Sequence, residues 1–283
     1  MTSDPGGPAV DTTAGAPGAP QPRAGILRPH PDGTGSRGTR LFGAVLLVAI
    51  AVFLFVALVA SPSDSGPNAS ENAMGQTVRI MYVHVPVAVA CYLAFLVTAI
   101  GSVGYLWKRS DGWDALAAAS AEVGCVFTAL TLATGSVWGK IAWGTWWEWD
   151  PRLTSTLLML VVYVGYLALR GAIVDPVVRA KRSAIVGLVA LANVPIVHFS
   201  VDWWRGLHQP ATISRFDPTI DGLKLFALMF GMLVGVAVYG WLMVHRFRLQ
   251  YAQTQVEKQG LDVALAERRA EAVAAGHLAP KGM

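Results

Sequence analysis

Six long apolar segments, separated by short polar ones, organise the chain from residue 41 onward. Each is close in length to the roughly 20 helical residues that cross a hydrocarbon core of about 30 Å. Inside such a core only helices and closed barrels satisfy every backbone polar group, so the pattern predicts an all-α integral membrane protein with six transmembrane helices. The predicted spans are Leu41–Ala60, Tyr82–Trp107, Ala115–Val137, Pro151–Arg170, Ser183–Val201 and Leu223–Val244.

The composition agrees with this pattern. Of 283 residues, 54% are apolar and only 14% are charged, and the mean hydropathy is +0.47. Soluble domains carry about 25% charged residues, so an ordinary water-soluble globule is excluded. Three regions follow: a disordered N-terminal arm at 1–40, a six-helix domain at 41–248, and a polar tail at 249–283. The arm is rich in Pro, Gly, Ala and Thr, which cannot bury enough apolar surface to fold.

The net charge of +4 reflects topology rather than affinity for nucleic acid. Cytoplasmic loops of membrane proteins carry an excess of Lys and Arg. If the N-terminus is cytoplasmic, most of the 22 Lys and Arg residues fall on that side. The outer segments keep only Arg79, Lys140, Arg152, Arg205, Arg215 and Lys224. We therefore expect both termini in the cytoplasm.

Seven of the ten tryptophans fall in two short outer segments. These are Trp138, Trp143, Trp146, Trp147 and Trp149, within a tryptophan-rich loop at 138–152, and Trp203 and Trp204 between the last two spans. Indoles also anchor helix ends at the membrane surface, but such a belt should populate both interfaces. This density on one side favours a floor for a flat, aromatic, largely apolar ligand such as haem.

Two histidines flank this surface. His84 opens the second span, and His208 follows the second tryptophan pair. A histidine at a helix end is often only solvated, but neutral imidazole is also a common haem ligand, so these two are candidate axial ligands. We expect His198, in the last turn of the fifth span, to be a packed or supporting residue. Cys91 and Cys125 form no C-x-x-C-H site, so covalent attachment of haem to this chain is excluded.

Charged residues near the same surface have two readings each. Arg79 and Arg152 could donate forked hydrogen bonds to haem propionates or could simply anchor the interface. Asp150, followed by Pro151, is typical of a helix N-cap, and we expect it to fix the loop rather than touch a ligand. Glu122 is acidic and lies within a span, where pairing with an inner-side cation is expected.

Three motifs carry a resemblance to a known family. WGTWWEWDPRLT at 143–154, RIMYVHVP before the second span, and NVPIVHFSVDWWRGLHQP at the end of the fifth resemble the haem exporter protein C (CcmC) family of tryptophan-rich WWD haem-handling proteins. The resemblance runs from about Arg79 to Phe247. It implies that His84 and His208 are the two outer axial ligands of non-covalent haem b, held by the WWD loop at the outer face.

The resemblance also implies a role in cytochrome c maturation. The chain would lie in the bacterial inner membrane as a multi-pass protein and deliver haem to a periplasmic haem chaperone, CcmE. Its other expected partners are the ABC transporter subunits CcmA and CcmB, the small single-span subunit CcmD, and membrane lipid. Such a protein is not expected to be an enzyme in its own right, although it could promote covalent attachment of haem to its acceptor.

Two other classes remain open on the residues alone. A membrane b-type cytochrome would carry electrons between quinol and an acceptor, but such proteins usually place histidine pairs within their spans. A transporter for another amphipathic solute would use the indoles as a girdle facing lipid. Absence of a Soret band in the purified protein would favour the transporter, and cycling of the bound haem with quinol analogues would favour the cytochrome.

Overall fold

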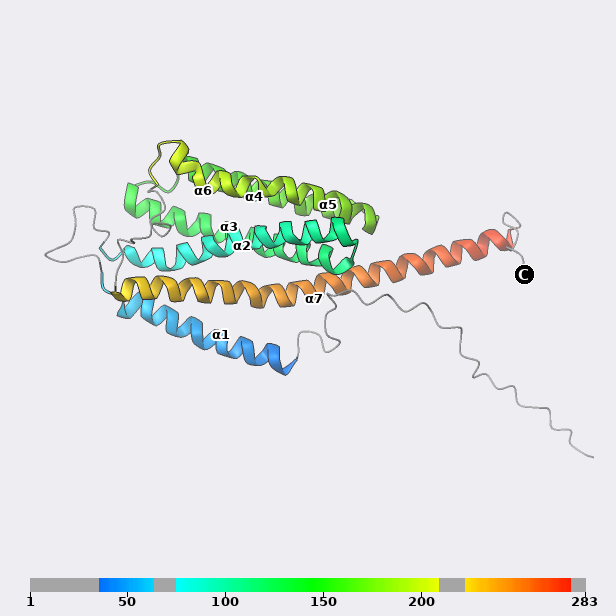
Figure 1. Ribbon diagram of the computed structural model, residues 1–283, viewed down its shortest axis with the longest axis horizontal. Helices are drawn as coiled ribbons and strands as arrows, with labels where there is room; N and C mark the ends of the chain where they lie inside the picture. Colours follow the sequence, from blue (N-terminus) through cyan, green and yellow to red (C-terminus); the bar gives the residue numbers. More distant parts are fainter. Residues whose placement is uncertain (1–35, 64–74, 209–221, 276–283) are drawn as a thin grey trace, which may run out of the picture.

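The six expected spans are present in the computed structural model, which describes residues 36–63, 75–208 and 222–275. The helices lie alongside one another as a bundle (Figure 1). In chain order they are α1 (Arg37–Phe55) with its π-helical continuation η2 (Val56–Ala60), α2 (Val78–Lys108), α3 (Asp111–Trp143), α4 (Pro151–Ala172), α5 (Pro176–Leu191), α6 (Asn193–Trp203) and α7 (Gly222–Ala274). Most of the arm expected at 1–40, and residues 276–283 of the tail, lie outside the described residues.

Helices α2 and α3 form the centre of the bundle, and small side chains allow them to approach closely. A Cβ atom added to Gly101 would lie 2.8 Å from the backbone nitrogen of Ala117. Close approach of helix backbones through small residues is a common way for membrane helices to associate, because lipid provides no hydrophobic drive between them. Across the core, Phe95 of α2 stacks on Tyr163 of α4 with ring centroids 3.6 Å apart.

The fifth span is divided into two helices. Helix α5 ends at Leu191, and α6 begins at Asn193. Pro195 explains the break, because it has no N–H to donate and its ring clashes with the carbonyl four residues earlier. Asn193 donates a hydrogen bond from Nδ2 to the carbonyl of Ser155 at 3.3 Å, so the broken end of the span stays attached to α4.

Helix α7 continues well past the other helices (Figure 1). The boundary expected between residues 248 and 249 therefore falls inside one continuous helix. Lys258 pairs with Asp111 at the start of α3 at 2.6 Å, and Glu257 pairs with Arg179 of α5. These contacts hold the first part of the extension against the bundle.

Glu122 pairs with a cation, as expected. Its carboxylate accepts hydrogen bonds from Nε of Arg246 and from Nε2 of Gln250, the latter at 2.6 Å. Both partners lie on α7, so the carboxylate joins α3 to α7 on the half of the bundle nearer the C-terminal extension. The intramembrane acid therefore has a structural explanation.

Candidate functional site

The candidate residues gather at one end of the bundle. Because the number of spans is even, the ends of α1 and α7 that lead to the termini are at the same end (Figure 1). The opposite end, which we call the distal end, holds the start of α2, the last turns of α3, the segment Gly144–Asp150, the start of α4, the end of α6 and residues 204–208 after it. His84, His208 and all seven tryptophans belong to these segments.

The tryptophan-rich loop is shorter than predicted. The sequence analysis ended the third span at Val137, whereas α3 continues to Trp143 and stops where Gly144 adopts φ +79. Trp138 and Trp143 are therefore helical residues, and the loop proper is 144–150. It folds back on α3, because Ser136 donates a hydrogen bond to the carbonyl of Trp146 at 2.5 Å.

Asp150 joins this loop to His208. As expected, it is the N-cap of α4, and its Oδ1 accepts from the backbone nitrogen of Arg152 at 2.9 Å. The same carboxylate lies 2.9 Å from Nδ1 of His208, and its Oδ2 accepts from the backbone nitrogen of Leu207 at 2.7 Å. Its side chain is 1% exposed. The sequence analysis assigned Asp150 the cap alone and missed this second role.

A glycine makes this contact possible. A Cβ atom added to Gly206 would lie 2.1 Å from Oδ2 of Asp150 and 2.9 Å from Cδ of Pro151. No real Cβ fits at such distances without displacing the carboxylate or the chain around it. The glycine in WWRGLHQP therefore lets the segment before His208 pass directly over the start of α4.

The pKa values around this contact are both lowered. Burial lowers the pKa of His208 and Arg152 lowers it further, and together these exceed the opposing effect of Asp150. For Asp150, burial raises the pKa, but the interaction with the His208 ring and hydrogen bonds from three backbone N–H groups outweigh it. The pair is therefore an ionised carboxylate beside a neutral imidazole. Because an ionised carboxylate only accepts, His208 donates from Nδ1 and carries an unprotonated Nε2.

His84 is held in a comparable way by a different group. Its Nδ1 lies 2.9 Å from Oγ1 of Thr134 on α3. That hydroxyl donates its own proton to the carbonyl of Leu130 at 2.8 Å, so it accepts from His84. The tautomer that fits has Nδ1 protonated and Nε2 free. Gly135 lies beside the ring, and a Cβ atom there would be 3.0 Å from Cε1 of His84.

The structure brings the two histidines and one arginine into a single site. His84, His208 and Arg152 lie close enough together for electrostatic interaction between each pair of them. Arg152 donates from Nη2 to the carbonyl of His198 at 3.1 Å, while its buried Nε has no hydrogen-bond partner among the described residues. The His198 ring packs against Tyr92 and Phe199, consistent with the supporting role expected for it.

The tryptophans divide into two groups. Trp143 packs against His208 with ring centroids 4.8 Å apart, and Trp138 packs against His84 at 5.6 Å. The indole nitrogens of Trp138 and Trp147 are buried and lack partners within the described part of the chain. The other four, Trp146, Trp149, Trp203 and Trp204, are more than half exposed. The site thus has indoles beside each histidine and further indoles on the surface.

Arg79 lies in a different contact. It donates from Nη2 to the carbonyl of Ser61 at 3.2 Å and so ties the start of α2 to the end of η2. Of the two candidate arginines, Arg152 is the one whose charge acts on both histidines.

These residues fit an iron porphyrin. Two neutral imidazoles, each with Nδ1 hydrogen-bonded and Nε2 free, form the donor set that axial ligation requires. Indoles beside both rings offer flat apolar contact. The buried Nε of Arg152 has no partner among the described residues and leaves a donor for a carboxylate.

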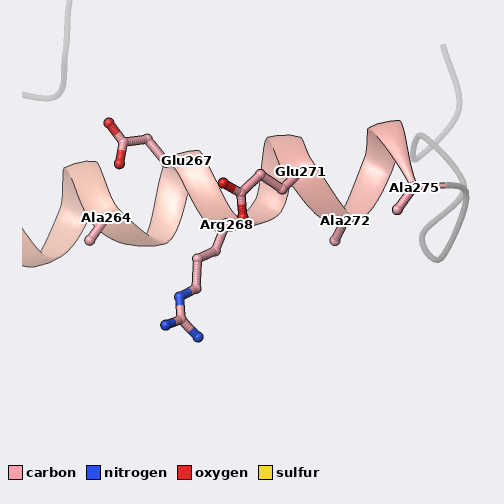
Figure 2. A pocket seen from close by; sticks show the side chains of 6 residues that line it. All are labelled: Ala264, Glu267, Arg268, Glu271, Ala272 and Ala275. Atoms are coloured by element: carbon pink, nitrogen blue, oxygen red, sulfur yellow. The ribbon is translucent and has the colours of Figure 1, made fainter.

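A separate hollow lies on the far part of α7 (Figure 2). It is lined by Ala264, Glu267, Arg268, Glu271, Ala272 and Ala275. All six side chains project from one helix, and Glu267 and Arg268 point in different directions (Figure 2). A surface without an opposing wall cannot enclose a ligand, and we assign none to it.

Comparison with known proteins shows the family to which the chain belongs. The family model described as heme exporter protein C matches residues 34–262, a range that includes every candidate residue of the site. The chain belongs to the haem exporter protein C family. The match to this family ends within α7, so the last described turns of its extension lie beyond it.

Individual relatives carry the same family name. The chain is 35% identical to heme exporter protein C of Haemophilus influenzae over 222 residues. This match covers 77% of this chain and 86% of the relative. It is 43% identical over 168 residues to the protein of that name from Bradyrhizobium diazoefficiens, covering 59% of this chain and 63% of the relative. A ccmC-like mitochondrial protein of cytochrome c biosynthesis from Marchantia polymorpha is 38% identical over 174 residues, covering 62% and 70%.

Proposed function

We propose that this member of the haem exporter protein C family binds haem b non-covalently between His84 and His208 and presents it for cytochrome c maturation. The observation that supports this most strongly is the matched state of the two rings. Each donates from Nδ1 to an oxygen, at 2.9 Å in both cases, and each therefore offers the lone pair of Nε2. Metal-bound histidines usually have this arrangement, because the hydrogen bond fixes the tautomer and the ring orientation.

The surrounding residues have separate tasks in this proposal. Trp138 and Trp143, which pack beside the two rings, confine the porphyrin plane. Arg152 neutralises a propionate, and the loop 144–150 covers the site and limits access of water. Arg79 supports the start of α2 rather than the ligand. Holding one edge of the ring in a fixed orientation replaces a random encounter with the acceptor by a positioned one, which is a general source of rate.

Delivery needs a surface where an acceptor can dock. The exposed indoles, Trp146, Trp149, Trp203 and Trp204, lie in the segments that form the site. Large aromatic side chains are enriched at protein interfaces, and here they favour docking of the periplasmic chaperone CcmE. The lysine and arginine bias supports a periplasmic position of the distal end, in the bacterial inner membrane. CcmA, CcmB and CcmD are the partners proposed within the membrane complex.

Absorption spectra of the purified full chain test the binding site. Wild-type protein from haem-replete cells is expected to show a Soret band and the spectrum of six-coordinate low-spin haem. His84→Ala and His208→Ala should each lose the six-coordinate features. His198→Ala is the matched control, because this ring lies at the same end of the bundle but packs against Tyr92 and Phe199. Unchanged spectra in the first two variants, with folding retained, would overturn the proposal.

A further inference from the structure

The two candidate ligands are supported by groups of different chemistry. His208 donates to the carboxylate of Asp150, whereas His84 donates to the hydroxyl of Thr134. A carboxylate that accepts from Nδ1 draws the N–H proton toward itself, which places more electron density on Nε2 and makes the imidazole a stronger ligand. A hydroxyl does this less, and the Thr134 hydroxyl is further committed as donor to the carbonyl of Leu130.

The two histidines also differ in the hydrogen bonds that hold them in place. His208 lies in the non-helical segment that follows α6. Asp150 accepts hydrogen bonds from its Nδ1 and from the backbone nitrogens of Leu207 and His208, so three hydrogen bonds hold this segment. His84 lies on α2, and among the described residues its ring is hydrogen-bonded to the side chain of Thr134. The close approach of Gly135 leaves its imidazole little room for other positions. The strength of a bond between His84 and iron would therefore depend on Thr134.

We infer that the two axial bonds are unequal, that His84 is the ligand an acceptor displaces, and that Thr134 is the positioning residue that sets the strength of this bond. The inference rests on the proposed function. In the exchange, the bond between the iron and Nε2 of His84 breaks and one between the iron and a donor atom of the acceptor forms. The lone pair returns to His84, and no electron or proton is transferred. The stronger bond to His208 retains the haem until the new bond has formed.

Carbon monoxide binding to the reduced, haem-loaded full chain tests this order, because the gas can bind only after an axial ligand has left. The rate therefore reports dissociation of the weaker ligand. Thr134→Val removes the acceptor at nearly constant shape and should accelerate carbon monoxide binding. Thr134→Asp supplies a carboxylate and should slow it, by about tenfold if the effect matches that of other such supporting groups. A purely structural role for Thr134 would not move the rate in opposite directions.

Thr131 provides the matched control. It lies on the same helix and donates to the carbonyl of Phe127 at 2.8 Å, as Thr134 does to Leu130. Thr131→Val and Thr131→Asp should leave the rate unchanged. His84→Ala should retain haem and bind carbon monoxide without the slow dissociation step, whereas His208→Ala should lose most of its haem.

Two results separate this inference from the proposed function. A six-coordinate wild-type spectrum that both histidine variants disrupt, together with equal rates in wild type and both Thr134 variants, overturns the inference alone. The same holds if His208→Ala retains haem better than His84→Ala. A chain that takes up no haem, or whose spectrum does not depend on either histidine, overturns both.

Discussion

The side chains of Asp150 and His208, 58 residues apart in the sequence, lie 2.9 Å apart in the structure. One carboxylate thereby caps a transmembrane helix and supports a candidate metal ligand. The first role rests on the loop that precedes α4, and the second on the segment that follows α6. Any change in how these two segments meet therefore alters both helix packing and the position of the imidazole.

Replacing Asp150 by Asn should separate these two roles. Asparagine caps helices about as well as aspartate, so helix α4 should be retained. The imidazole would lose its charged acceptor, and haem affinity should fall about 10- to 100-fold. Titration of the purified apoprotein with haem measures this. Asp175→Asn is the control, because Asp175 caps α5 in the same way, accepting from Val177 and Val178. Equal affinities in the two variants would show that the carboxylate does not support the ligand.

Replacing Gly206 by Ala should weaken haem binding through sterics alone. The new methyl group would need the space occupied by Oδ2 of Asp150, at 2.1 Å, so the carboxylate must move away from Leu207 and His208. We expect a loss of affinity comparable to that of Asp150→Asn. Gly165→Ala is the control, because a Cβ atom there meets nothing within 4 Å. If Gly206→Ala binds haem as the wild type does, the described path of this segment is wrong.

The stability of the apoprotein should depend on pH through His208. The pKa of His208 lies below the ordinary value near 6.5, and burial is the largest cause of this decrease. Below about pH 6.5 the unfolded chain takes up a proton at His208 that the folded chain does not. The unfolded state then binds more protons, so the free energy of unfolding decreases as the pH falls through this window. His208→Gln should flatten the dependence of Tm on pH between about 7.5 and 5.5, and parallel curves would contradict this.

The sequence predicts the spans well because their length and apolarity are local properties. It predicts the N-cap at Asp150 for the same reason. It does not predict that Asp150 reaches His208, or that Thr134 meets His84, because both contacts depend on how distant helices pack. The sequence does not predict the helical state of Trp143, because apolarity marks only the part of a helix within the hydrocarbon core, and α3 continues beyond the predicted end at Val137. Pro195 carries a local signal for the break in the fifth span.

Breaking the buried pair of Arg170 and Asp114 should lower the free energy of unfolding more than breaking an exposed pair does. The guanidinium donates to both carboxylate oxygens, at 2.6 and 2.8 Å, and the side chains are only 11% and 7% exposed. Removing one partner leaves a buried charge unpaired, which costs about 3–5 kcal/mol. Arg170→Met should therefore lower the unfolding free energy by about that amount, measured by titration with a denaturing detergent.

Two further variants isolate the cause of this loss. Arg170→Met combined with Asp114→Leu removes both charges and should restore much of the stability, since a buried ion pair often contributes little beyond an apolar pair of similar volume. Arg179→Met breaks the pair with Glu257, whose side chain is 47% exposed, and should cost no more than about 1 kcal/mol. If the double variant were as unstable as Arg170→Met alone, the loss would come from packing around Arg170 and Tyr166 rather than from an unpaired carboxylate.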